Sequence, residues 1–351
     1  MKKITHTLPT PSHENSHQLW MVPYARNACF IGREMELQEI AATLDAGQYG
    51  TGGQAISGAG GSGKTQLALE YVHLHREKYR AVFWVLAETR EALNAAYSDI
   101  AILLDLPEKK EQEHHLIVEA VKGWLASRHD WLLILDHAMD LGLMKDFLPA
   151  PVTGHLLLTT RASTTGKLAR RIKLKTLDEE NGVRLLLCRS GTVTDGNEPV
   201  ETAPGDYEAA KAIVSELDRL PLALDLAGAY IAATSCGLPA YLELLRRQQT
   251  RRAKEGEDQP GPVARALRLS CEKLAKVSSA TLELLQLCAF FAPDEIPERL
   301  LVASVSALTK PLQKLLASPH KLDTALTTLQ NYALVTRDPE IRTLVVQREV
   351  Q

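Results

Sequence analysis

Residues 58–65 read GAGGSGKT and directly follow a short apolar run, QAIS, at 54–57. The glycines at 58, 60, 61 and 63 allow backbone conformations that a Cβ atom would block, so successive N–H groups can turn inward around an anion. Lys64 adds a positive charge beside them. The octapeptide therefore predicts a phosphate-binding loop with a nucleoside triphosphate as its ligand.

A helix is expected to begin near Lys64, because KTQLALEYVHLHREKY at 64–79 has apolar residues along one side. The N-terminus of a helix is the positive end of its dipole, which favours bound phosphate. The hydroxyl of Thr65 is a suitable ligand for Mg²⁺, which proteins hold together with waters and phosphate oxygens. Thr65 is therefore the first predicted magnesium ligand.

The same glycines also fit G-x-G-x-x-G, the pattern of dinucleotide-binding proteins, which would indicate NAD or FAD as cofactor. That pattern does not need Lys-Thr after its third glycine, and it expects an acidic residue about twenty residues further on. Residues 81–87 read AVFWVLA, and Glu88 comes too late. The phosphate loop of a nucleoside triphosphatase is the favoured interpretation.

The composition is that of an ordinary soluble protein, with 351 residues, 45% apolar and 24% charged. A net charge of −3 gives no overall field that would favour nucleic acid or an anionic membrane. The first twenty residues lack the apolar run of a signal peptide, and no stretch of eighteen apolar residues follows. We expect a cytoplasmic protein with no membrane partner. The five cysteines have no C-x-x-C spacing, so we expect free thiols and no zinc site.

Short apolar runs alternate with helical stretches in the first half of the chain. The runs are AVFWVLA (81–87), WLLILD (131–136), HLLLTT (155–160) and RIKLKT (171–176). Such an alternation indicates an α/β fold whose parallel sheet is buried on both faces. The ligand of such a sheet lies at the carboxyl ends of its strands.

Helical patterns replace the strands from residue 178 onward, and two β-like runs, ALVTRD and IRTLVVQ, end the chain. The fold class expected is therefore α/β: a P-loop NTPase parallel sheet followed by a helical subdomain and a winged-helix module. The expected divisions are a disordered polar tail (1–22), the P-loop domain (23–177), the helical subdomain (178–250), a charged linker (251–262) and the winged-helix-like module (263–351).

Two residues at the ends of predicted strands are candidates for contacts with Mg²⁺ and with the γ-phosphate. Asp136 ends WLLILD, where a carboxylate can serve Mg²⁺ directly or through water, opposite Thr65. Arg161 follows HLLLTT, where its guanidinium can contact the γ-phosphate of a triphosphate. His137 follows Asp136 where a hydrolytic site usually has a second carboxylate, so any hydrolysis is expected to be slow. Lys64, Asp136 and Arg161 are the residues expected to act in it.

Six segments in order resemble the NB-ARC group of STAND ATPases, and especially bacterial members that also carry tetratricopeptide repeats. They are LWMVPYARNACFIGRE (19–34), SGAGGSGKTQLALEY (57–71), LLILDHAMDL (132–141), LLLTTRASTTGKLARRI (156–172), LPLALDLAGAYI (220–231) and LQLCAFFAPDEIPERLL (285–301). The resemblance implies that Phe30, Ile31 and Arg33 lie beside the adenine and ribose, and that Pro221 closes over the base. The nucleotide-binding set implied is Phe30, Ile31, Arg33, Gly58, Ala59, Gly60, Gly61, Ser62, Gly63, Lys64, Thr65, Gln66, Pro221 and Gln347.

The chain departs from the family pattern at several of these positions. LDHAM replaces LDNAD, so His137 and Met139 stand where the family has an amide and a carboxylate. Gln347, in TLVVQREVQ, stands where the family has a histidine that contacts the diphosphate. A glutamine amide can donate one hydrogen bond but cannot become cationic, so we expect ADP to be held less firmly. No repeat array follows, so the sensing module is expected to be missing or encoded elsewhere.

The function expected is an ATP/ADP-binding switch of the STAND class, with Mg²⁺, in signalling or defence. Slow hydrolysis would reset it, a homo-oligomer would form in the ATP state, and an unidentified protein would act as effector or sensor. One alternative is a fast AAA+-like motor, which a turnover assay would separate from a switch. Another is a DNA-binding regulator, which the balanced charge of residues 263–351 disfavours.

Overall fold

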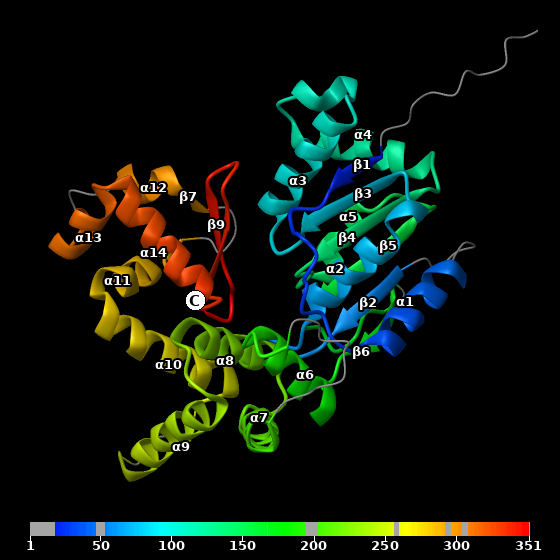
Figure 1. The fold of residues 1–351 in the computed structure, drawn as a ribbon. Coiled ribbons are helices and arrows are strands. Elements are labelled where there is room, and N and C mark those ends of the chain that lie inside the picture. The colour runs from blue at the N-terminus through cyan, green and yellow to red at the C-terminus, as the bar shows by residue number, and fades with distance from the viewer. Residues whose placement is uncertain are drawn as a thin grey trace, which may run out of the picture. The chain divides into compact units, whose positions relative to one another are not determined.

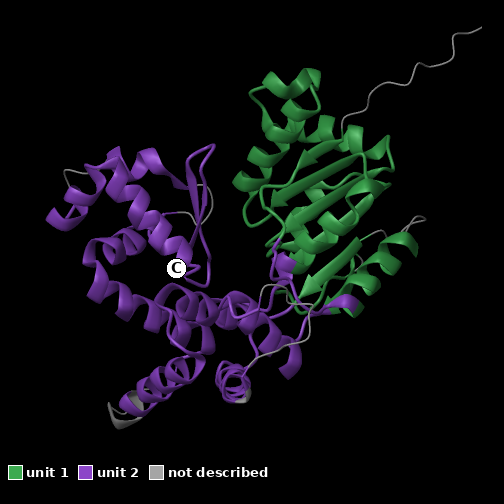
Figure 2. Cartoon of the chain, in the orientation of Figure 1, with its two compact units in different colours: residues 1–26, 35–57, 67–172 green, residues 27–34, 58–66, 173–351 purple. Residues whose placement is uncertain are grey.

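The computed structural model of the chain describes residues 18–46, 53–166, 168–193, 203–255, 260–291, 296–303 and 308–350. The chain divides into two compact units, shown in Figure 2. Unit 1 consists of residues 1–26, 35–57 and 67–172. Unit 2 consists of residues 27–34, 58–66 and 173–351, so it contains the glycine-rich loop as well as the C-terminal half.

Unit 1 is built on a six-stranded sheet (Figure 1) with the order β1-β3-β4-β5-β2-β6. The strands are β1 (Leu19–Met21), β2 (Gly53–Ser57), β3 (Ala81–Leu86), β4 (Trp131–Asp136), β5 (His155–Thr160) and β6 (Arg170–Lys173). The pairs β1–β3, β3–β4, β4–β5 and β2–β5 are all parallel. Parallel strands need crossover connections, which helices provide here. The predicted α/β class is confirmed.

Helices cover the sheet because its strands are apolar on both faces. The helices with residues in this unit are α1 (Glu34–Ala46), α2 (Lys64–Leu74), α3 (Arg90–Leu103), α4 (His114–Ala126) and α5 (Leu141–Phe147). Alternate strand residues such as Phe83, Leu133 and Leu158 share one core with α3, α4 and α5. The intervening residues, such as Ile134 and Leu157, are fully buried as well, so the opposite face is also covered.

The N-terminal boundary differs from the expectation of a disordered tail over 1–22. Residues Leu19–Met21 form β1, which pairs in register with Ala81, Val82 and Phe83 of β3. A three-residue strand at a sheet edge is too short to give a periodic signal, and β3 supplies the hydrogen-bonding partner that stabilises it. The rest of the predicted tail, residues 1–17, lies outside the described residues.

Unit 2 is mainly helical. Its helices are α6 (Glu179–Arg189), α7 (Pro204–Glu216), α8 (Pro221–Thr234), α9 (Leu238–Glu255), α10 (Pro262–Val277), α11 (Ser279–Cys288), α12 (Glu298–Ala303), α13 (Lys310–Leu316) and α14 (Pro319–Asn331). A small antiparallel sheet of β7 (Ile296–Pro297), β9 (Thr343–Val346) and β8 (Val335–Asp338) completes it. One apolar core runs from Ile31 through these helices to Val350.

The sequence predicted a mainly helical region after residue 178, but it misplaced one boundary and missed three elements. Helix α9 continues to Glu255, so the first residues of the predicted linker, 251–255, are helical. They read RRAKE, and each of these residue types favours helix. Helices α12 and α13 and strand β7 have at most seven residues each and were not predicted, because such short elements show little periodicity.

Among the described residues, no single helix has the length and apolar composition needed to cross a membrane. One pair of helices passes that test together: Pro221–Thr234 with Leu238–Arg251, which are bent by 120° relative to each other.

The close contact between Gly154 and the side chain of Trp131 in unit 1 gives a test of the fold. A Cβ atom on Gly154 would lie 2.4 Å from Cδ2 of Trp131, a fully buried side chain. Gly154→Ala should therefore lower the free energy of unfolding by about 1–3 kcal/mol, the usual effect of overpacking a core. Gly123, within α4, has open space around its Cα, so Gly123→Ala should instead raise stability by about 0.5–1 kcal/mol. Urea unfolding of both variants measures the difference, and equal shifts would contradict this packing.

Candidate phosphate-binding site

The glycine-rich loop leaves strand β2 after Ser57 and enters helix α2 at Lys64. Gly61 and Gly63 have φ values of +71° and +91°, in the left-handed region where a Cβ is disfavoured. The loop closes on itself, because the ammonium group of Lys64 donates to the carbonyl oxygens of Gly58 (3.0 Å) and Ala59 (2.8 Å). Lys64 is 8% exposed, so its charge is held at the loop and not in solvent.

The loop has the features of a phosphate cradle. A Cβ atom on Gly58 would lie 2.9 Å from both the carbonyl oxygen of Leu174 and Oγ of Ser62, so only glycine fits there. Oγ of Ser62 is buried and has no hydrogen-bond partner. A buried hydroxyl without a partner is costly, and an anion with acceptor oxygens would satisfy it. Together with Lys64, these residues fit a bound phosphate.

The peptide units around Gly61 are held by two other segments of unit 2. The carbonyl oxygen of Gly61 accepts a hydrogen bond from the backbone N–H of Leu222 (3.2 Å), in the first turn of α8. The N–H of Gly61 donates to Oε1 of Glu349 (3.3 Å). Pro221, the first residue of α8, directly precedes Leu222, so the predicted base-closing residue belongs to the turn that contacts the loop.

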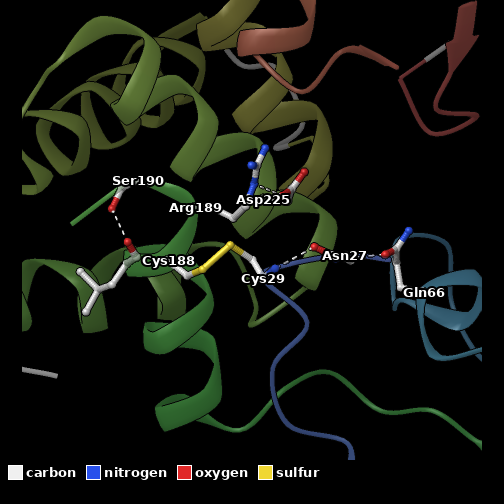
Figure 3. The surroundings of a disulfide bond; sticks show 8 residues. Asn27, Cys29, Gln66, Cys188, Arg189, Ser190 and Asp225 are labelled. Atoms are coloured by element: carbon white, nitrogen blue, oxygen red, sulfur yellow. Dashed lines mark hydrogen bonds and ion pairs between the residues drawn. A yellow bond between two sulfur atoms is a disulfide. The ribbon is translucent and has the colours of Figure 1, made fainter. Parts of the chain in front are cut away.

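The predicted adenine segment also lies in unit 2, over residues 27–34. Figure 3 shows Asn27 between Cys29 and Gln66: its side-chain oxygen accepts from the N–H of Cys29 (3.0 Å), and its amide donates to Gln66 (3.0 Å). Since Gln66 lies in the first turn of α2, this hydrogen bond ties the segment to the end of the glycine-rich loop.

The other predicted adenine-side residues are placed by contacts with the start of the helical region. Ile31 is 7% exposed and belongs to the apolar core of unit 2. The guanidinium of Arg33 donates to the carbonyl oxygen of Lys175. Arg33 has a φ of +72°, an uncommon conformation for a residue with a Cβ. The backbone N–H of Phe30 donates to the carbonyl oxygen of Asn27, which closes a turn before them.

A disulfide bond joins Cys29 to Cys188 in the last turn of α6 (Figure 3), with their Cα atoms 6.1 Å apart. The expectation that all five cysteines are free thiols is therefore wrong for these two. They are 159 residues apart in sequence, and connectivity between such distant cysteines cannot be deduced from spacing. Cys236, Cys271 and Cys288 are free, as expected. The bond fixes the 27–34 segment on α6.

Asp136 lies in unit 1 as the last residue of β4, and its side chain is 1% exposed. The hydroxyl of Thr159, on the neighbouring strand β5, donates to Oδ1 of Asp136. The same hydroxyl accepts from the backbone N–H of His137 (2.9 Å), which has a φ of +58°. Thr159 thus fixes both the carboxylate and the turn after the strand, which orients Asp136 at the carboxyl edge of the sheet.

The predicted site residues divide between the two units. Arg161 follows β5 in unit 1 and is exposed. Gln347, in unit 2, is half-buried just after β9, and its carbonyl oxygen accepts from the N–H of Val350 (2.8 Å). Unit 2 thus contains the predicted adenine-side residues, the loop from Gly58 to Gln66, Pro221 and Gln347, whereas Asp136 and Arg161 belong to unit 1.

Three residues at this site were not predicted from the sequence: Asn27, Cys188 and Glu349. Glu349, whose carboxylate accepts from the N–H of Gly61, lies two positions after the predicted Gln347. No pattern in the sequence distinguishes Glu349 from other acidic residues, because its partner Gly61 is 288 positions away.

The fold and the site define a P-loop NTPase, in which a strand of a parallel sheet runs through a glycine-rich loop into a helix headed by lysine and a hydroxyl residue. Residues 33–195 match the NB-ARC domain family, and residues 272–351 match a family described as "Domain of unknown function (DUF7779)". The NB-ARC match over residues 33–195 supports a nucleotide-binding P-loop ATPase of the STAND class.

Two known proteins are similar to this chain. A "Nucleotide-binding leucine-rich repeat (NLR)-like protein" of Hyaloscypha variabilis is 28% identical over 269 residues, covering 69% of this chain and 26% of that protein. A STAND protein "with a tetratricopeptide repeat sensor" from Pyrococcus horikoshii has the same fold, with a TM-score of 0.52 at 16% identity, covering 97% of this chain and 43% of that one. The chain spans about a quarter of the length of the first and under half of the second.

The disulfide can be tested by counting thiols and measuring stability. Of the five cysteines, three should react with a chromogenic thiol reagent in denatured, unreduced protein, and all five after reduction.

Cys29→Ser should lower the unfolding free energy by up to about 5 kcal/mol, the chain-entropy limit for so long a loop. Reduction should remove the difference from the wild type. The control Cys236→Ser, which alters a free thiol, should leave the effect of reduction unchanged. Five reactive thiols before reduction would refute the bond.

Proposed function

We propose that this protein is an ATP/ADP-operated molecular switch, in which exchange of the nucleotide changes the arrangement of its parts and so controls a signalling or defence response. The observation that carries the proposal is the glycine-rich loop closed by Lys64, with the buried Ser62 hydroxyl available to an anion. The NB-ARC match and the NLR-like relative support the same class of function.

In this proposal the residues of unit 2 bind the nucleotide. Backbone amides of the loop and Lys64 bind the phosphates, while Phe30, Ile31 and Arg33 lie beside the adenine and ribose. Pro221 closes over the base. The attachment of residues 27–34 to Gln66 and to α6 supports this, because a base-binding segment must be held at a fixed position relative to the phosphate loop.

Magnesium would be held by Thr65 and by Asp136, directly or through water. The described residues contain no group of three or more His, Cys, Asp or Glu side chains arranged for a metal ion. Mg²⁺ at nucleotide sites needs only one or two protein ligands, because phosphate oxygens and waters complete its octahedron. The fixed, buried carboxylate of Asp136 suits such a role, since Thr159 already orients it.

Arg161 would distinguish ATP from ADP by contacting the γ-phosphate. Support comes from the sheet, where Ser57 and Thr160 are register partners at the carboxyl ends of β2 and β5. The phosphate loop follows Ser57 in the chain, and Arg161 follows Thr160. A γ-phosphate contact gives the two nucleotides different affinities for the two states of a switch, which a population shift requires. Hydrolysis is proposed to be slow, because His137 and Met139 supply no second carboxylate. An ATP-dependent homo-oligomer and a protein effector belong to the same proposal.

Nucleotide binding is tested with Lys64→Ala. Removing the ammonium group should weaken ATP and ADP binding at least tenfold, since a charge-assisted hydrogen bond contributes about 1.5–3 kcal/mol. Titration calorimetry of folded protein with Mg²⁺ measures the affinities. Lys145→Ala, an exposed lysine on α5, is the matched control and should bind as the wild type does. Full affinity in Lys64→Ala would refute the assignment of the site.

The γ-phosphate contact is tested with Arg161→Ala. The variant should lose at least fivefold in affinity for a non-hydrolysable ATP analogue and keep the wild-type affinity for ADP, because only the triphosphate offers the contact. Arg80→Ala, which removes an exposed arginine before β3 in the same unit, should change neither affinity. Equal losses for the two nucleotides would show that Arg161 does not distinguish them.

A further inference from the structure

Glu349 places a carboxylate oxygen 3.3 Å from the backbone nitrogen of Gly61, in the middle of the phosphate loop. The side chain is half-buried, and both residues belong to unit 2. The N–H of Gly61 points to this carboxylate while its carbonyl oxygen is held by Leu222 of α8. The loop thus already accommodates one anionic group, which the chain itself supplies.

The position of Glu349 is fixed by the segment that carries it. Strand β9 ends at Val346, which is 1% exposed, and Val350 is also buried. A turn between them is closed by the hydrogen bond from the N–H of Val350 to the carbonyl oxygen of Gln347. The carboxylate is therefore presented from a turn anchored on both sides in the apolar core of unit 2.

A carboxylate oxygen and a phosphate oxygen can both accept the hydrogen bond that the N–H of Gly61 donates. Both are anionic acceptors that bind backbone N–H groups in such concavities. One N–H cannot donate a full hydrogen bond to two anions, and two anions in contact repel each other. A polyphosphate that uses the amide of Gly61 must displace Glu349.

We propose that Glu349 is a built-in competitor of the nucleotide phosphates, whose release from Gly61 couples nucleotide binding to the C-terminal segment around β9. This inference rests on the proposed function, because it requires that the loop binds a nucleotide. Coupling of this kind is reciprocal: the nucleotide loosens the Glu349 segment to the same extent that the segment weakens nucleotide binding. Glu349 thereby sets the affinity of the site without contacting the nucleotide.

The test compares Glu349→Gln and Glu349→Ala with a matched control. Both variants should bind ATP and ADP about tenfold more tightly than the wild type, because the competing charged hydrogen bond is removed. Glu340→Gln, an equal charge change at an exposed position between β8 and β9, should leave both affinities within twofold of the wild type. Titration calorimetry with Mg²⁺ and each nucleotide measures all four proteins.

Hydrogen exchange provides a second readout on the unmodified protein. Saturating ADP should increase amide exchange in residues 343–350 of the wild type, and should have little effect there in Glu349→Ala, which lacks the carboxylate that ADP would displace. Unchanged exchange in the wild type at saturation would overturn the proposal. The comparison of wild-type protein with and without ADP needs no variant, so it tests the proposal even if Glu349→Ala does not fold.

The outcomes separate the inference from the function on which it rests. Nucleotide binding by the wild type with equal affinity in Glu349→Gln would refute the competitor and leave the proposed function intact. Binding by Glu349→Gln but not by the wild type would support both. No binding by the wild type or by either variant, with all proteins folded, would refute the proposed function and the competitor with it.

Discussion

The conformation of the loop at residues 58–65 is the constraint on which the rest of the site depends. Lys64 folds back onto the carbonyl oxygens of Gly58 and Ala59, and glycines at 61 and 63 take up the left-handed turns that this closure requires. This closure holds the ammonium charge of Lys64 within the loop. Leu222 and Glu349, from other parts of unit 2, contact the loop at the backbone of Gly61.

Much of the fold was predictable because it depends on local pattern. Strands β4 and β5 have the predicted bounds to the residue, since an apolar run marks each one. The glycine-rich loop was equally clear, because its residue types follow from the backbone geometry alone.

The features that were not predicted depend on pairs of residues far apart in the chain. Cys29 and Cys188 are 159 positions apart, and Gly61 and Glu349 are 288 positions apart. Neither pair can be recognised from the sequence, because nothing in the periodicity or composition around one residue identifies its distant partner. Strand β1 is similar on a smaller scale: three residues become a strand only where β3 offers an edge to pair with.

The distribution of these contacts also bears on how a ligand at the loop would act on the molecule. Residues 58–66 join β2 and the greater part of α2 through the chain, yet they group with the helical half by their contacts. Hydrogen bonds between Gly61 and Leu222, between Gly61 and Glu349, and between Asn27 and Gln66 are among these contacts. An anion that accepts from the N–H of Gly61 competes directly with the bond to Glu349, whereas the bonds of Leu222 and Asn27 use no N–H group of the loop. Under the proposed function, exchange of this hydrogen bond would let a nucleotide change a contact between segments without unfolding either of them.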